Sequence, residues 1–198
     1  VLGIAAMNLQ GLQGAVFQML AHGVSTGGLF LIVGMLSDRR HTRLIAEFGG
    51  LKRVMPRLTA AFLLVALSSI GLPGLNGFVG EFLILLGAFR WQPGLAAAAA
   101  IGVVLSAVYM LWMFQRVNYG EATSEQNAAL ADLHAREWWT LGPALASIVL
   151  MGVAPTLFLR PMEPALERLV ERVGRTRPIT AQRTDTAPAL DIRLPAPE

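Results

Sequence analysis

Long apolar stretches separated by polar segments run through most of the chain. A helix needs about 20 apolar residues to cross the roughly 30 Å hydrocarbon core of a bilayer. Several stretches reach this length without a single Asp, Glu, Lys or Arg. The pattern predicts an all-α fold, a polytopic bundle of transmembrane helices in residues 1–159. The expected spans are a partial one at 1–7 and complete ones at 12–36, 58–89, 95–115 and 138–159, with a short polar connection at 8–14.

The segment 58–89 is too long for one straight span and too short for two. Its 32 residues would make a straight helix of roughly 48 Å, whereas two spans and a turn need about 40 residues. It contains the sequence Leu-Pro-Gly-Leu-Asn-Gly at 72–77, where proline removes a backbone donor and the glycines weaken a helix. We therefore predict a discontinuous helix broken at 73–77, with half-helices near 58–72 and 78–89. Breaks of this kind line protein or water inside a membrane and tend to mark ion or substrate sites.

The C-terminal part of the chain has a different character. Apolar residues follow helical spacing from Met162 to Val173, with charged residues on the opposite face. This pattern predicts an amphipathic helix at 160–173 that lies on the membrane surface or on a partner. Residues 174–198 are rich in Pro, Thr, Ala and Arg without periodicity, and we expect them to be disordered.

Composition agrees with a membrane protein and excludes several other classes. The chain is 54% apolar and 15% charged, against about 45–50% and about 25% in soluble domains. It contains no cysteine, which excludes a disulfide-stapled module and a Cys-ligated metal or redox site. A soluble enzyme and a disordered chain are excluded by the same composition.

The charge distribution indicates a membrane topology. The pI is near 10.2, but the basic residues gather in one loop and in the tail, so we expect contact with lipid headgroups and no nucleic-acid partner. Six basic residues lie in the loop 38–57, which the positive-inside rule places in the cytoplasm together with 116–137. The chain opens with Val1 in apolar sequence and lacks the features of a signal peptide. We therefore expect an internal start, in the C-terminal part of a longer protein.

Two ionisable side chains, His22 and Glu81, fall at membrane depth. Such residues usually face a cavity and mark a proton or ion path. Burial disfavours the carboxylate form of Glu81, whereas the positive end of its half-helix favours it, and a group balanced in this way can change protonation. An imidazole such as His22 can pass a proton on through its two nitrogens. The alternatives are a glutamate paired statically and a neutral histidine bonded to a neighbouring helix.

Several blocks of sequence together resemble one family. They are Ala21-His22-Gly23, Arg40-His41-Thr42-Arg43, Gly49-Gly50-Leu51 and the run from Leu72 to Phe82. In this order and spacing they resemble the subunit M (chain 4) family of bacterial NADH-quinone oxidoreductase, respiratory complex I. The resemblance covers about residues 1–159, the second of two inverted repeats in an antiporter-like protein of 14 spans. Sister subunits and related antiporters usually carry Lys where Glu81 stands, so Glu81 favours subunit M.

The resemblance implies a mechanism and a setting. Quinone reduction elsewhere in the complex would drive protons along a polar axis, with Glu81 at the exit side and His22 in the connecting chain. The subunit would hold no cofactor of its own, because NADH, FMN, iron–sulfur clusters and quinone belong to other subunits. Its partners would be other membrane-arm subunits, including sister antiporter-like subunits, and the lipid of the bacterial inner membrane. The first repeat, with its buried lysines, is missing here, and Lys52 is the only lysine of the chain.

Two other functions remain open at this point. A subunit of a multi-subunit cation/proton antiporter would share the fold and need no electron donor. A scaffold bundle with structural charges would not transport protons at all. NADH-linked activity of co-purifying material separates the first alternative from complex I, and replacement of Glu81 tests the second.

Overall fold

The computed structural model describes residues 1–121 and 124–176, and within them the fold is helical, without a β-strand. A short 3-10 helix, η1, spans Ile45–Glu47. The α-helices are α1 (Leu2–Ala5), α2 (Leu9–Arg40), α3 (Leu51–Val54), α4 (Pro56–Ser69), α5 (Asn76–Trp91), α6 (Pro93–Asn118), α7 (Glu125–Ala128), α8 (Ala135–Val153) and α9 (Thr156–Thr176).

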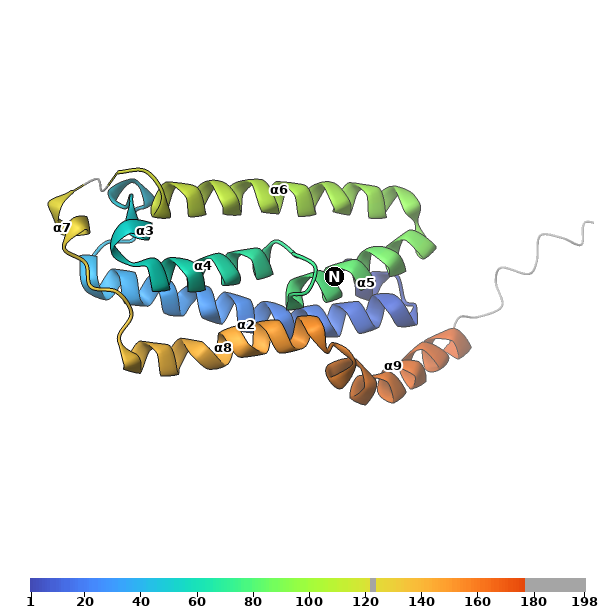
Figure 1. The fold of residues 1–198 in the computed structure, drawn as a ribbon. Coiled ribbons are helices and arrows are strands. Elements are labelled where there is room, and N and C mark those ends of the chain that lie inside the picture. Colours follow the sequence, from blue (N-terminus) through green and yellow to red (C-terminus); the bar gives the residue numbers. More distant parts are fainter. Residues whose placement is uncertain (122–123, 177–198) are drawn as a thin grey trace, which may run out of the picture.

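The long helices form an elongated bundle (Figure 1). Among the described residues, α2 and α6 are each long and apolar enough to cross a membrane, and α8 with α9 would count as a third span if the bent pair is taken together. The helices α4 and α5 follow one another along the bundle and together form the discontinuous helix (Figure 1). The prediction of an all-α transmembrane bundle with one discontinuous helix is confirmed.

The break in the discontinuous helix lies at residues 70–75, earlier than the predicted 73–77. Gly71, just after the end of α4, and Gly74, just before α5, adopt left-handed φ values of 75° and 92°, which glycine reaches without steric cost. Asn76 and Gly77 instead open α5, where the first backbone N–H groups need no partner inside the helix. Glu81 is therefore the sixth residue of α5 and not the fourth, as the half-helix at 78–89 had implied.

The last predicted span, 138–159, is not one straight helix. Helices α8 and α9 meet at an angle of 67° at Ala154 and Pro155, because proline lacks a backbone donor and disfavours helical geometry in the residue before it. The amphipathic helix consequently begins at Thr156 and not at residue 160. Near its start, Phe158 and Leu159 pack against residues of α2 and α8. Most of the predicted disordered tail, from residue 177, lies outside the described residues.

The first complete span is longer than predicted, and the polar connection at 8–14 is mostly helical. Helix α2 begins at Leu9 because Asn8 caps it: the Asn8 side chain accepts a hydrogen bond of 2.8 Å from the backbone N–H of Gly11. The Asn8 amide also donates to the carbonyl of Gly87 at 2.8 Å, which ties the start of α2 to the end of α5. A Cβ at Gly14 would lie 2.6 Å from the backbone nitrogen of Ile84, so glycine allows the two helices to touch.

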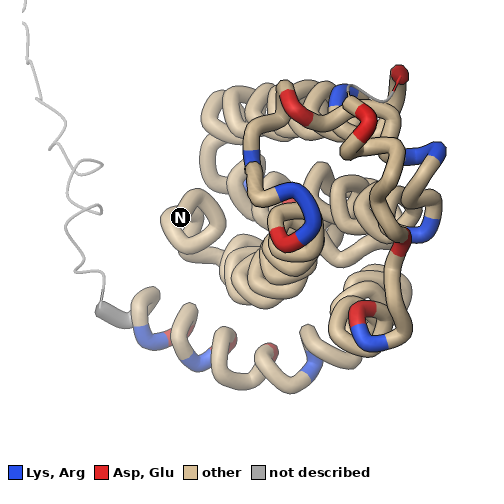
Figure 2. The backbone as a smooth tube through the Cα atoms, turned by 90° about the vertical axis from the view of Figure 1, so that its left-hand side faces the viewer, with Lys and Arg blue, Asp and Glu red and all other residues tan. Residues whose placement is uncertain are grey.

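The polar connections gather at one end of the bundle. Residues 38–57, 116–121 and 124–137 meet where α2 and α6 end and α4 and α8 begin (Figure 1). Viewed from that end, most Lys, Arg, Asp and Glu residues of the bundle lie in these connections, and others follow α9 along the outside (Figure 2). Between the helices an apolar core packs residues such as Leu58, Phe62 and Phe114, with the two rings edge to face at a centroid distance of 5.3 Å.

Candidate functional site

A polar cavity of about 380 Å³ lies between α2, α4, α5 and α6. Both ionisable residues predicted from the sequence, His22 and Glu81, line it. Seven uncharged polar side chains surround them, contributed by three helices. They are Gln18, Ser25 and Thr26 on α2, Ser68 and Ser69 on α4, and Ser106 and Tyr109 on α6.

His22 belongs to a ladder of polar residues along α2. Gln18, His22 and Thr26 are spaced four residues apart, so they occupy the same face of the helix. The Thr26 hydroxyl lies 3.3 Å from each ring nitrogen of His22, within hydrogen-bond reach of both. The histidine is exposed in the described part of the chain, so its ring is open both to the cavity and to whatever covers this face of α2.

Glu81 is half-buried and lies against the break in the discontinuous helix. A Cβ at Gly71 would stand 3.3 Å from Cδ of Glu81, which places the carboxyl group beside the end of α4. The helix dipole acts most strongly in the first turn of a helix. Glu81 is the sixth residue of α5 and lies beyond that turn, so the dipole acts on it only weakly. Within residues 1–121 and 124–176, no ion pair to Glu81 is found.

A buried hydrogen-bond network joins three walls of the cavity. Asn76, at the start of α5, is fully buried and contacts the hydroxyl groups of Ser25 on α2 and Ser68 on α4. Its amide nitrogen also donates to the carbonyl of Ala21 at 3.0 Å. The two serine hydroxyls lie 2.7 Å apart. The network closes one side of the cavity and attaches α5 to α2 next to His22.

Gln18 of α2 lies against the backbone of Gly80, the residue before Glu81. A Cβ at Gly80 would lie 2.8 Å from Cβ of Gln18, so α2 and α5 approach closely at this point. The side-chain oxygen of Gln18 is buried and has no hydrogen-bond partner among the described residues. Buried polar atoms are usually paired, and exceptions often occur at functional positions.

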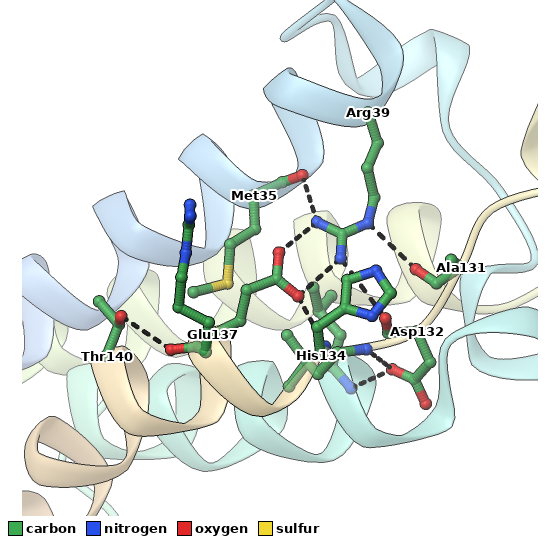
Figure 3. A network of polar contacts seen from close by, with 10 residues as sticks. Met35, Arg39, Ala131, Asp132, His134, Glu137 and Thr140 are labelled. Atoms are coloured by element: carbon green, nitrogen blue, oxygen red, sulfur yellow. Dashed lines mark hydrogen bonds and ion pairs between the residues drawn. The ribbon is translucent and has the colours of Figure 1, made fainter.

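A second polar cluster lies at the charged end of the bundle (Figure 3). The Arg39 guanidinium binds both carboxylate oxygens of Glu137, at 2.6 and 2.7 Å. It also donates to the backbone carbonyls of Met35 and Ala131, at 2.9 and 3.0 Å. This bidentate pair connects the end of α2 to the first turn of α8 and is a strong form of ion pair.

Asp132 extends this cluster to α4. Its carboxylate accepts hydrogen bonds from the backbone N–H groups of Arg57 and Leu58, at 2.9 and 3.1 Å. These N–H groups belong to the first turn of α4, whose N-cap residue, Met55, offers no side-chain acceptor. The half-helix in front of the break is thus capped by a residue from a distant loop.

Comparisons with known proteins place the chain in a family. The transmembrane family described as NADH:quinone oxidoreductase/Mrp antiporter matches residues 1–107. The chain belongs to this family. It is 43% identical over 183 residues to NADH-quinone oxidoreductase subunit M of Rhodobacter capsulatus, covering 92% of this chain and 36% of the relative. Chain 4 of the NADH-ubiquinone oxidoreductase of Arabidopsis thaliana is 40% identical over 170 residues, covering 86% and 34%.

Solved structures of the family have the same fold. Respiratory complex I from Thermus thermophilus contains a chain that matches with a TM-score of 0.81 and 39% identity, over 86% of this chain and 36% of that one. A chain of the Mrp complex from Dietzia sp. matches with a TM-score of 0.71 and 22% identity, over 87% and 40%, and shows the fold alone. The chain spans about a third of the length of the curated relatives, and its resemblance to subunit M is confirmed.

Within this antiporter-like fold, sequence reasoning located two cavity residues and missed others. His22 and Glu81 stood out because ionisable side chains are rare in apolar spans. Ser68 was missed, although Ser68 and Ser69 form a polar pair near the end of an apolar helix and such a pair can indicate a polar site. The ion pair between Arg39 and Glu137 was harder to predict from the sequence, because each residue only adjoins an apolar stretch.

Proposed function

We propose that this chain is the second-repeat part of a proton-translocating subunit in the membrane arm of a bacterial NADH-quinone oxidoreductase. In this proposal protons cross the polar cavity between His22 and Glu81. The observation that carries it is that these two titratable side chains, from different helices, line one polar cavity within an otherwise apolar bundle.

Each of the two residues suits a different task in this path. Glu81 has no ion-pair partner in the described part of the chain, and its carboxyl group lies beside Gly71 in the break, so its charge can respond to a proton or a moving partner charge. His22 lies within reach of Thr26, has two ring nitrogens through which a proton can pass, and is open to the outside of α2. Water in the cavity would bridge the two, as ordered water does in other polar sites.

The proposed setting follows from the family. Relatives bear the names of NADH-quinone oxidoreductase subunits, so we assign this chain a non-redox role in that enzyme and no cofactor of its own. NADH, FMN, iron–sulfur clusters and quinone would be held by other subunits. The partners would be the other membrane-arm subunits, including sister antiporter-like subunits. We place it as a multi-pass protein in the bacterial inner membrane, with the loop at 38–57 on the cytoplasmic side.

The test is Glu81→Gln in the full-length subunit within its assembled complex. The substitution keeps size and hydrogen bonding but removes titration, so proton pumping and coupled quinone reduction should fall while NADH oxidation with an artificial acceptor persists. Glu125→Gln, at an exposed position on α7, is the matched control and should pump normally. His22→Ala should lower pumping less than Glu81→Gln, because water can fill the gap. Normal pumping by Glu81→Gln in a fully assembled complex contradicts the proposal.

A multi-subunit cation/proton antiporter is the second candidate. It is favoured by the matching family, whose description names the Mrp antiporter beside NADH:quinone oxidoreductase. The two candidates separate when the full-length protein is purified in mild detergent and its associated subunits are assayed. NADH oxidation together with flavin and iron–sulfur absorbance supports complex I. Membrane subunits without those signals support the antiporter.

A further inference from the structure

Asn76 is a fully buried amide at the start of α5. Its side-chain oxygen accepts a hydrogen bond from the Ser68 hydroxyl, and the Ser25 hydroxyl oxygen lies 3.3 Å from it. Its nitrogen donates to the carbonyl of Ala21 at 3.0 Å and to the hydroxyl oxygen of Ser25 at 3.2 Å. The Asn76 side chain is uncharged, is not the N-cap of α5 and has no contact with solvent. It nevertheless makes four polar contacts to two other helices.

These contacts can close into a ring in which every donor is used. Ser25 donates to Ser68 at 2.7 Å, Ser68 donates to the oxygen of Asn76, and the nitrogen of Asn76 donates back to Ser25. The second N–H of the amide is taken by Ala21. A buried network satisfied in this way is rigid, since opening it leaves polar groups unpaired in an apolar interior.

The ring acts at the point where the discontinuous helix lacks support from its own backbone. Residues 70–75 interrupt the helical hydrogen bonds, so α4 does not fix the start of α5. Ala21 immediately precedes His22 in α2, and Glu81 follows Asn76 by less than two turns in α5. Asn76 therefore joins the helix that carries one cavity residue to the helix that carries the other.

We propose that Asn76 is a positioning residue, which holds the start of α5, and with it Glu81, in register with His22 across the cavity. The inference rests on the proposed function and deepens it. It also assigns the roles of Ser25 and Ser68: their protons are engaged in the ring, so they offer the cavity acceptor oxygens only. Proton transfer then runs through the cavity between His22 and Glu81 and not along the serines.

The test compares Asn76→Leu with Asn118→Leu in the full-length subunit within its assembled complex. Asn118 is an equally buried amide, but it lies at the end of α6, away from the break, where it accepts from Thr59 at 3.0 Å and donates to the carbonyl of Phe114. Protons pumped per NADH oxidised are measured in proteoliposomes across a range of pH, and assembly is checked by the yield of intact complex. A purely structural role would reduce yield equally in both variants and leave the pumping ratio unchanged.

We expect Asn76→Leu to lower coupled pumping by about tenfold or more, as misplacement of a reacting group does elsewhere, and to change its pH profile. Asn118→Leu should keep the wild-type ratio in whatever complex assembles. Asn76→Ser fits the same space but cannot reach both helices, so it should also lose pumping. It replaces Asn76→Leu as the test variant if the leucine variant does not assemble. Ser25→Ala should lose less than either, because the bond from Asn76 to Ala21 remains.

Each result has a distinct meaning. If Asn76→Leu and Asn76→Ser pump normally while Glu81→Gln does not, the positioning role is overturned and the proposed function stands. If Glu81→Gln pumps normally, the proposed function itself fails. A loss in Ser25→Ala as large as in the Asn76 variants would overturn the assignment of the serines as acceptors only.

Discussion

Replacement of Arg39 by glutamine should destabilise the charged end of the bundle. The guanidinium makes two hydrogen bonds to Glu137 and one each to the carbonyls of Met35 and Ala131, all between 2.6 and 3.0 Å. Glutamine is too short to replace these bonds together and carries no charge. Removal would leave the Glu137 carboxylate without its cation at the start of α8.

The side-chain exposure sets the expected magnitude. Loss of one partner of a fully buried ion pair costs about 3–5 kcal/mol, whereas an exposed pair contributes about 0–1 kcal/mol. The side chains of Arg39 and Glu137 are 14% and 18% exposed, close to the buried limit. We therefore expect Arg39→Gln to lower the free energy of unfolding by about 2–3 kcal/mol.

Reversible unfolding of the purified full-length protein in mixed detergent micelles measures this loss. Trp138 and Trp139 directly follow Glu137, so tryptophan fluorescence is sensitive to this region. Arg136→Gln removes the same charge from an exposed neighbouring position and should change stability by no more than about 0.5 kcal/mol. In a double-mutant cycle, Arg39→Gln and Glu137→Gln should couple by about 1–2 kcal/mol. Equal losses in the two arginine variants, or coupling under about 0.5 kcal/mol, would refute this reasoning.

Two further substitutions test local packing and capping, with the same unfolding measurement. Asp132→Ala removes the acceptor for the first turn of α4 and should cost about 1 kcal/mol, whereas Asp132→Asn, which retains an acceptor, should recover most of that loss. An equal loss in both Asp132 variants would argue against the cap. Gly80→Ala places a Cβ 2.8 Å from that of Gln18 and should cost about 1–3 kcal/mol by overpacking. Gly102→Ala, where a Cβ meets nothing within 4 Å, should be neutral or slightly stabilising, and a similar cost there would exclude the close contact as the cause.

The local sequence pattern predicted that the helix is discontinuous, but not the exact bounds of the break. Excess length over one span and the cluster of proline and glycine at 72–77 predicted the break without any structure. Its start was placed three residues too late and its end two, because the bounds depend on which glycines adopt left-handed geometry, here Gly71 and Gly74. The same error shifted Glu81 within its helix, which weakened the argument from the helix dipole.

The end of α8 shows the complementary case. Pro155 indicated a bend, but the apolar residues Phe158 and Leu159 favoured a span that continued to residue 159. In the structure these residues belong to α9 and pack against Phe17 and Met151 on other helices. Both arrangements bury the same apolar side chains, so hydrophobicity alone could not choose between them.

The sequence by itself determined that the chain is a bundle of membrane helices, because the length and charge of each apolar stretch decide whether it can enter a bilayer. It also singled out His22 and Glu81, because ionisation inside apolar surroundings is costly wherever the fold places it. Only the tertiary structure decided that these two residues share one cavity and that Asn76 and Arg39 hold distant segments together. Such contacts join residues many positions apart, and no local spacing specifies which faces of two helices will meet.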